Sequence, residues 1–186
     1  MNTREKILTT AAFLFQKNGY HATGLNEIIK ESGTPKGSLY YYFPNGKEEL
    51  VAATIKLMGD KIQHQIEEEL AKNSDPVQAF KEFILDLARD FNEKDHENCF
   101  SISLLALETV SMSESLRKTC IEVYDLWTDI YYHKLVDSGF SSEKATELSS
   151  ILQLMIEGAI TVSLIRNDTT MLVAAAEKIP ILLDNN

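Results

Sequence analysis

The sequence predicts an all-α protein of about nine helices, and three observations support that prediction. Eight glycines and four prolines in 186 residues are about half the usual share of turn-forming residues, too few for a β-sandwich or β-barrel. No segment of useful length alternates apolar and polar residues, whereas apolar residues recur at helical spacing along most of the chain. Hydrophobic residues make up 44% and charged residues 25%, which is typical of a folded globular domain.

The first helix is expected over Thr3–Asn18. Its apolar residues, from Ile7 to Phe15, recur three, four and five positions apart and therefore form one stripe along the helix. Gly19 follows directly, and glycine is the residue that most readily adopts the left-handed conformation that ends a helix. The first helix is therefore expected to stop there.

Two short helices are expected next. Thr23 is a suitable N-cap for the second helix, and Gly33 is a suitable stop for it. Pro35 fits the start of a third helix over Lys36–Tyr42. Two helices of similar length joined by a glycine turn predict a helix-turn-helix over about residues 24–43.

Six further helices are expected over residues 47–72, 76–93, 99–110, 113–136, 143–166 and 171–183. Ser142 is expected to cap the fifth of these, and Pro180 to kink or end the sixth. Residues 1–61 are expected to form one domain and residues 73–186 another, with the helix over 47–72 as the only extended link between them.

Charge is distributed unevenly along the chain. The net charge is −10, yet residues 1–47 carry six cations and three anions, whereas the remainder carries 12 cations and 25 anions. A basic end can contact nucleic acid while an acidic body limits non-specific binding. The sequence therefore permits double-stranded DNA as a partner despite its acidic total.

A cytoplasmic location is expected. Cys99 and Cys120 are too few for a disulfide framework, which favours a reducing compartment. The first residues contain no signal-peptide hydrophobic segment, and no uninterrupted apolar run approaches the roughly 20 residues of a membrane helix. No membrane partner is expected.

The third helix combines small and donor residues with three tyrosines. Its start has little bulk and several hydrogen-bond donors, so its backbone can approach base edges or phosphates: Thr34, Lys36, Gly37 and Ser38. Successive residues on a helix point about 100° apart, so Tyr40, Tyr41 and Tyr42 cannot all be core. Lys47 adds a positive charge nearby. From residue types alone, DNA contact and simple packing or solubility are equally good interpretations.

Several spaced motifs over residues 4–61 resemble the TetR-type helix-turn-helix domain. They are Arg4-Glu5-Lys6-Ile7-Leu8, Gly19-Tyr20, Thr23, Ile28, Gly33, the run from Lys36 to Phe43, and Lys47-Glu48-Glu49-Leu50. Phe43-Pro44-Asn45-Gly46-Lys47 is one residue longer than the commoner family form and is similar to the LmrA/YxaF-like branch. Weaker matches to that branch follow at Asn98-Cys99, Leu105-Ala106-Leu107-Glu108 and Ile156-Glu157-Gly158-Ala159.

This resemblance implies a ligand-responsive, dimeric transcriptional repressor without a cofactor. Matching positions imply phosphate contacts by Thr23, Tyr41, Tyr42 and Lys47. They imply base-edge or close backbone contacts by Thr34, Lys36, Gly37, Ser38 and Tyr40. The inserted Gly46 leaves the geometry of Lys47 open.

Aromatic and long apolar residues on neighbouring helices predict a small-molecule effector site: Phe100, Leu104, Met112, Tyr124, Trp127, Tyr131 and Met155. An ordinary core position is the better interpretation for any one of them taken alone. Glu157 lies in an apolar helix and needs a partner if it is buried. The helices over residues 142–183 are apolar over much of their circumference, which favours a homodimer interface.

Two other classes of function compete with this one. A small metal-dependent or redox enzyme is the first, because Glu93-x-x-His96 matches half of a di-iron motif and two cysteines are present. A helical protein-binding adaptor is the second. No nucleophile elbow and no glycine-rich phosphate loop is present, so no catalytic residue is expected. A di-iron bundle needs two such motifs with inward-facing glutamates, and this single one lies in a polar helix end, so no metal site is expected.

Overall fold

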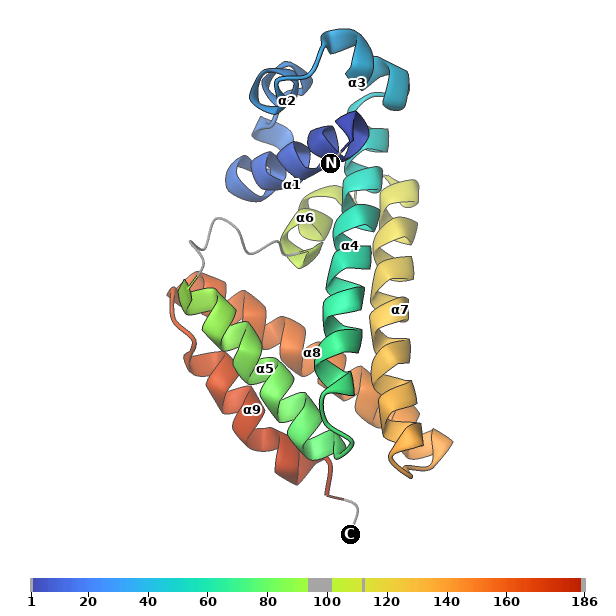
Figure 1. Cartoon of the computed structure of the whole chain (residues 1–186), viewed down its shortest axis with the longest axis vertical. Helices are drawn as coiled ribbons and strands as arrows, with labels where there is room; N and C mark the ends of the chain where they lie inside the picture. Colours follow the sequence, from blue (N-terminus) through green and yellow to red (C-terminus); the bar gives the residue numbers. More distant parts are fainter. Residues whose placement is uncertain (1, 94–101, 112, 185–186) are drawn as a thin grey trace. The chain divides into compact units, whose positions relative to one another are not determined.

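The computed structural model describes residues 2–93, 102–111 and 113–184, which contain nine α-helices and no strand (Figure 1). The helices are α1 Thr3–Ala22, α2 Leu25–Ser32, α3 Lys36–Tyr42, α4 Lys47–Ala71, α5 Pro76–Glu93, α6 Ile102–Thr109, α7 Glu114–Asp137, α8 Ser142–Arg166 and α9 Thr170–Leu182. The all-α prediction is confirmed. The chain forms two compact units, one of Met1–Lys61 with Glu97–Val123 and one of Ile62–His96 with Tyr124–Asn186.

Helix α1 begins in a capping box. The Asn2 side chain accepts a hydrogen bond from the Glu5 N–H at 2.9 Å, and the Glu5 carboxylate accepts one from the Asn2 N–H at 3.0 Å. Gly19 interrupts the helix with φ 81° and ψ 165°, and one further turn continues to Ala22. The expected break at Gly19 is therefore present, but helical structure resumes after it.

The predicted N-cap of α2 is wrong. Gly24 occupies that position without a side-chain hydrogen bond. The Thr23 hydroxyl is fully buried and instead donates to the carbonyls of Leu14 and Gly19, at 3.0 and 2.8 Å. The hydroxyl is therefore used by carbonyls near the interruption of α1 and is not available to cap α2. Gly33 ends α2 in the left-handed conformation, as expected.

One residue of helix α3 and the residue that follows it are buried, whereas Lys36, Gly37, Tyr40 and Tyr41 are exposed. Leu39 and Phe43 are buried against the first unit's core, and the helix contacts α1 and α2. Pro35 is its N-cap. The turn after α3 contains Gly46 at φ +79°, a conformation that glycine adopts without strain, and α4 begins at Lys47.

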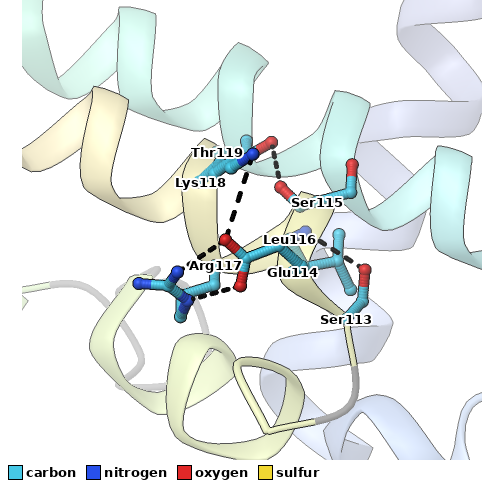
Figure 2. Close-up of polar contacts among 7 residues, drawn as sticks. All are labelled: Ser113, Glu114, Ser115, Leu116, Arg117, Lys118 and Thr119. Atoms are coloured by element: carbon cyan, nitrogen blue, oxygen red, sulfur yellow. Dashed lines mark hydrogen bonds and ion pairs between the residues drawn. The ribbon is translucent and has the colours of Figure 1, made fainter.

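Helix α6 packs on α1, and the first half of α7 packs on α4 within the same unit. A Cβ at Gly59 on α4 would lie 2.8 Å from a methyl group of Val123 on α7, so the two helices approach closely. Ser113 caps α7 by accepting the Leu116 N–H at 3.3 Å (Figure 2). In the next turn, the Glu114 carboxylate accepts a hydrogen bond from Arg117 at 2.9 Å.

The second unit is built around α5, α8, α9 and the second half of α7. Helix α9 packs on both α5 and α8. Tyr131 of α7 is buried with its ring edge-on to Phe80 of α5, the ring centroids 5.5 Å apart. Ser141, one residue before the expected Ser142, caps α8. Pro180 lies inside the last turn of α9, which ends two residues later.

Helix α4 is not the only long helix that joins the two units. It passes from the first unit to the second after Lys61, and α7 makes a second passage between Val123 and Tyr124. The expectation of a single extended link is therefore wrong. It failed because the first half of α7 belongs to the first unit and packs on α4, although it lies far from α4 in sequence.

One helix among the described residues, α8, has the length and composition of a membrane span. Its most apolar 18-residue window has a mean hydropathy of 1.7, and 39% of that window is buried within the chain. The helix is apolar on average, but polar residues such as Gln153 and Glu157 interrupt it, so it contains no long uninterrupted apolar run.

Candidate nucleic-acid interface

Four of the predicted contact residues lie exposed on or next to α3. Lys36 and Gly37 occupy its first turn, and Tyr40 and Tyr41 are 43% and 79% exposed. The Lys36 ammonium lies 5.9 Å from the Tyr40 ring centroid. At Gly37 no atom lies within 4 Å of a built Cβ, so the backbone is open to close approach. This face can present a cation, two phenol groups and bare backbone to a ligand.

Ser38, Tyr42 and Lys47 are half-buried. The Tyr42 ring packs edge-on against Tyr41, with centroids 5.1 Å apart. Tyr40 and Tyr41 are exposed whereas Tyr42 is half-buried, so none of the three tyrosines is a core residue.

Two predicted contact residues have buried hydroxyl groups. Thr23 donates to carbonyls inside the unit, as described above, and the Thr34 hydroxyl lies 2.8 Å from that of Ser32. Both side chains are thus engaged in holding the turns around α2. Thr23 is fully buried and Thr34 is only 8% exposed, so neither hydroxyl is presented to a ligand in this conformation.

Lys47 is placed by a residue that the sequence interpretation did not single out for this role, Tyr20. The Lys47 ammonium lies 4.3 Å from the Tyr20 ring centroid, a cation–π contact, and 3.5 Å from the His21 carbonyl, to which it donates. Partial burial lowers the pKa of Lys47, and the negative charge of Glu108 opposes that shift. The inserted Gly46 thus leaves Lys47 at the corner between α1 and α2.

Glu108 is a second residue that was missed. Its carboxylate accepts the Tyr20 N–H at 2.6 Å, across 88 positions of sequence. A Cβ at Gly19 would lie 2.8 Å from the same carboxylate. In the sequence, Gly19 followed by Tyr20 at the end of a helix indicates an unusual turn there. No sequence pattern indicates that a residue of α6 contacts this turn.

The predicted effector residues are distributed over both units. Leu104 belongs to the first unit and is 36% exposed, whereas Phe100 and Met112 lie outside the described residues. The others lie in the second unit on α7 and α8: Tyr124, Trp127, Tyr131, Met155 and Glu157. His96, from the alternative metal motif, also lies outside the described residues, as does the side chain of Glu93.

A polar cluster lies among the second-unit residues. The Tyr124 hydroxyl donates to Glu157 at 3.3 Å, and the Gln153 amide donates to the other Glu157 oxygen at 3.4 Å. The side-chain oxygen Oε1 of Gln153 is buried without a hydrogen-bond partner. Burial raises the pKa of Tyr131, and the charge of Glu157 raises it further. Trp127 and Tyr131 are almost fully buried, so they act as core in this conformation.

A helix-turn-helix with an exposed second helix, followed by a larger helical body, defines a class of DNA-binding transcriptional regulators. Comparison with known proteins agrees. Residues 7–54 match the family described as bacterial regulatory proteins, tetR family, and residues 76–178 match the transcriptional regulator LmrA/YxaF-like C-terminal domain.

Two curated relatives extend over nearly the whole chain. The HTH-type transcriptional regulator YxaF of Bacillus subtilis (strain 168) is 46% identical, with 98% of this chain and 95% of that protein covered. The HTH-type transcriptional regulator LmrA of the same organism is 42% identical, with 98% and 97% covered. The Bacillus subtilis regulator FadR, solved with stearoyl-CoA, shares the fold at a TM-score of 0.73 and 17% identity, with 98% of each chain covered.

The chain belongs to the tetR family of transcriptional regulators and carries the LmrA/YxaF-like C-terminal domain. It is a DNA-binding transcriptional regulator with a helix-turn-helix.

Proposed function

We propose that this regulator is a cytoplasmic, non-enzymatic repressor that binds a palindromic operator as a homodimer and is released by a small hydrophobic or aromatic effector. DNA binding is assigned to residues 1–61, and effector binding and dimerisation to residues 73–186. The observation that carries the proposal is the exposure of α3. Tyr41, a large aromatic residue, is 79% exposed on this helix and Lys36 is exposed as well, while Leu39 of the same helix is fully buried.

The exposed face of α3 divides into two kinds of contact. Lys36, Gly37, Ser38 and Tyr40 contact base edges or bring the protein backbone close to the DNA. Thr34 contributes its backbone groups to this set. Phosphates are contacted by Tyr41, Tyr42 and Lys47, while Thr23, which is fully buried, supports this contact only through the fold. Phosphate contacts fix the register on the duplex and base contacts select the sequence, so the two sets have separable effects.

The homodimer forms through α8 and α9. Each helix buries one face within its own chain, yet large apolar side chains remain on the surface: Leu154, Ile165 and Ile181 are 74%, 78% and 71% exposed. A two-fold partner that covers these side chains removes them from water. The same two-fold axis presents two α3 helices to the two halves of a palindrome.

The effector binds in the second unit, near the polar cluster of Tyr124, Gln153 and Glu157. A buried acceptor without a partner, such as the Gln153 side-chain oxygen Oε1, is satisfied by a hydrogen-bond donor of a ligand. Trp127 and Met155 supply apolar surface beside it. A family member with the same fold is known in complex with stearoyl-CoA, which supports a small-molecule site in this kind of body.

The test of the proposal is whether effector and operator exclude each other. Candidate aromatic effectors are titrated into the protein, by intrinsic Trp127 fluorescence, with and without operator DNA. Shifting the DNA-competent population from 99:1 to 1:99 takes about 5.5 kcal/mol of differential affinity. By reciprocity, operator DNA weakens effector binding by the same factor.

Two variants distinguish a true effector from a ligand bound at random. Glu157→Gln is expected to weaken effector binding while operator affinity stays unchanged, and the exposed Glu177→Gln on α9 is the matched control. If every compound binds equally well with and without operator, the second unit is a dimerisation scaffold and release by effector is wrong.

A further inference from the structure

A single carboxylate from α6 holds the corner between α1 and α2. The Glu108 oxygen Oε2 accepts the Tyr20 N–H at 2.6 Å, and Oε1 lies where a Cβ at Gly19 would come within 2.8 Å. Gly19 also has φ +81°, which side-chain-bearing residues rarely adopt. The corner is therefore shaped both by the conformational freedom of glycine and by the carboxylate that fills the space beside it.

The same corner seats Lys47. Its ammonium packs on the Tyr20 ring and donates to the His21 carbonyl, so two adjacent residues of the corner provide both contacts. The Tyr20 backbone that Glu108 fixes thus carries the ring that positions Lys47. A shift of this backbone would therefore displace both groups that contact the Lys47 ammonium, the Tyr20 ring and the His21 carbonyl.

The segment that bears Glu108 is itself anchored a few residues later. The Ser113 hydroxyl, which caps α7 (Figure 2), donates to the Glu48 carboxylate on the first turn of α4. Glu48 is the neighbour of Lys47 in the chain. Glu108 on α6 is thus hydrogen-bonded to Tyr20 at the α1–α2 corner, and Ser113 at the start of α7 is hydrogen-bonded to Glu48 at the start of α4. Lys47 lies next to one residue of each pair, Tyr20 and Glu48.

We propose that Glu108 is a positioning residue for DNA binding: by accepting the Tyr20 N–H, it holds the α1–α2 corner so that Lys47 meets a DNA phosphate. This inference rests on the proposed phosphate contact of Lys47. It assigns to α6 a role in operator affinity that is independent of any effector.

Two substitutions separate the reach of the Glu108 side chain from its charge. Glu108→Gln keeps an oxygen acceptor at the same distance but removes the charge. Glu108→Asp keeps the charge but retracts the acceptor by one methylene. Neither change creates a large cavity, so both variants are expected to fold. Glu114→Gln, which removes a carboxylate that is 60% exposed and paired with Arg117 at the first residue of α7, controls for net charge.

The measurement is operator affinity by fluorescence anisotropy over a range of salt concentrations. Glu108→Asp is expected to weaken binding at least fivefold and to reduce the slope of log K against log [salt] by about one, because one phosphate contact is lost. Glu108→Gln and Glu114→Gln are expected to stay within twofold of the wild type. The salt slope is measured because a variant whose first unit is only less stable would contain less active protein, and its slope would stay the same as in the wild type.

Other results overturn the inference. These are wild-type affinity for Glu108→Asp, a loss of affinity with an unchanged salt slope, or a loss in Glu108→Gln as large as in Glu108→Asp. Lys47→Ala is measured in parallel. If Lys47→Ala lowers the slope but Glu108→Asp does not, this inference alone fails. If Lys47→Ala leaves the slope unchanged, the proposed phosphate contact fails, and the positioning role with it.

Discussion

Lys36 is the exposed cation best placed to select a DNA sequence, because it begins α3 beside the open backbone of Gly37. Lys36→Ala is expected to cost about 1–3 kcal/mol of operator binding and to relax base preference at one position of each half-site. Competition between operator and random DNA measures both effects. Lys30→Ala, on the exposed surface of α2, is the matched control. An equal loss for operator and random DNA would make Lys36 a phosphate contact instead.

Thr23 acts within the fold through its buried hydroxyl, which donates to the Leu14 and Gly19 carbonyls. Thr23→Val keeps the side-chain shape but leaves those carbonyls without this donor. We expect the free energy of unfolding to fall by about 1–3 kcal/mol, measured by urea denaturation. Thr23→Ser keeps the hydroxyl and is the control. If Val and Ser variants are equally stable, the hydrogen bonds contribute nothing and the buried methyl group matters instead.

Residue types predicted which side chains could bind DNA, but not which of them are accessible. Lys36, Tyr40 and Tyr41 are exposed as a binding role requires. The hydroxyls of Thr23 and Thr34 have the right chemistry but satisfy groups inside the fold. That distinction depends on which carbonyls and hydroxyls face each other after folding, and no sequence spacing encodes it.

Element ends were predicted to within a few residues wherever glycine, proline or a polar cluster marks them. Gly33 ends α2, and Pro76 begins α5, because their backbone preferences are strong and local. The start of α2 and the cap of α8 were displaced by one residue. At those positions, neighbouring residues of similar capping ability compete, and tertiary contacts decide between them.

Helix α8 supplies the test of the proposed dimer. Leu154→Glu places a charge on a side chain that is 74% exposed in one chain, so the fold of each subunit is expected to survive. In a dimer interface the same charge is buried without a partner, which costs several kcal/mol and favours monomers. Light scattering measures the mass. Leu107→Glu on α6, equally exposed at 74%, is the control. A Leu154→Glu variant that stays dimeric would place the interface elsewhere.

At the scale of the whole molecule, two long helices rather than one carry the chain between its compact units. Helices α4 and α7 each have one half in either unit. In the proposed release by effector, these two helices are the connections along which a change in the second unit would reach the first. The sequence showed the length of both helices, but it did not show that the first half of α7 packs on α4, because such contacts join distant positions.

In the proposed homodimer, two copies of α3 select a specific DNA sequence. The most direct test of this proposal is selection of bound fragments from a pool of random double-stranded DNA by the wild-type protein, followed by sequencing. We expect enrichment of a two-fold symmetric sequence whose half-sites are separated by about one helical turn, 34–36 Å, or somewhat more. A bound pool with the same composition as the starting pool, or an enriched sequence without two-fold symmetry, would contradict it.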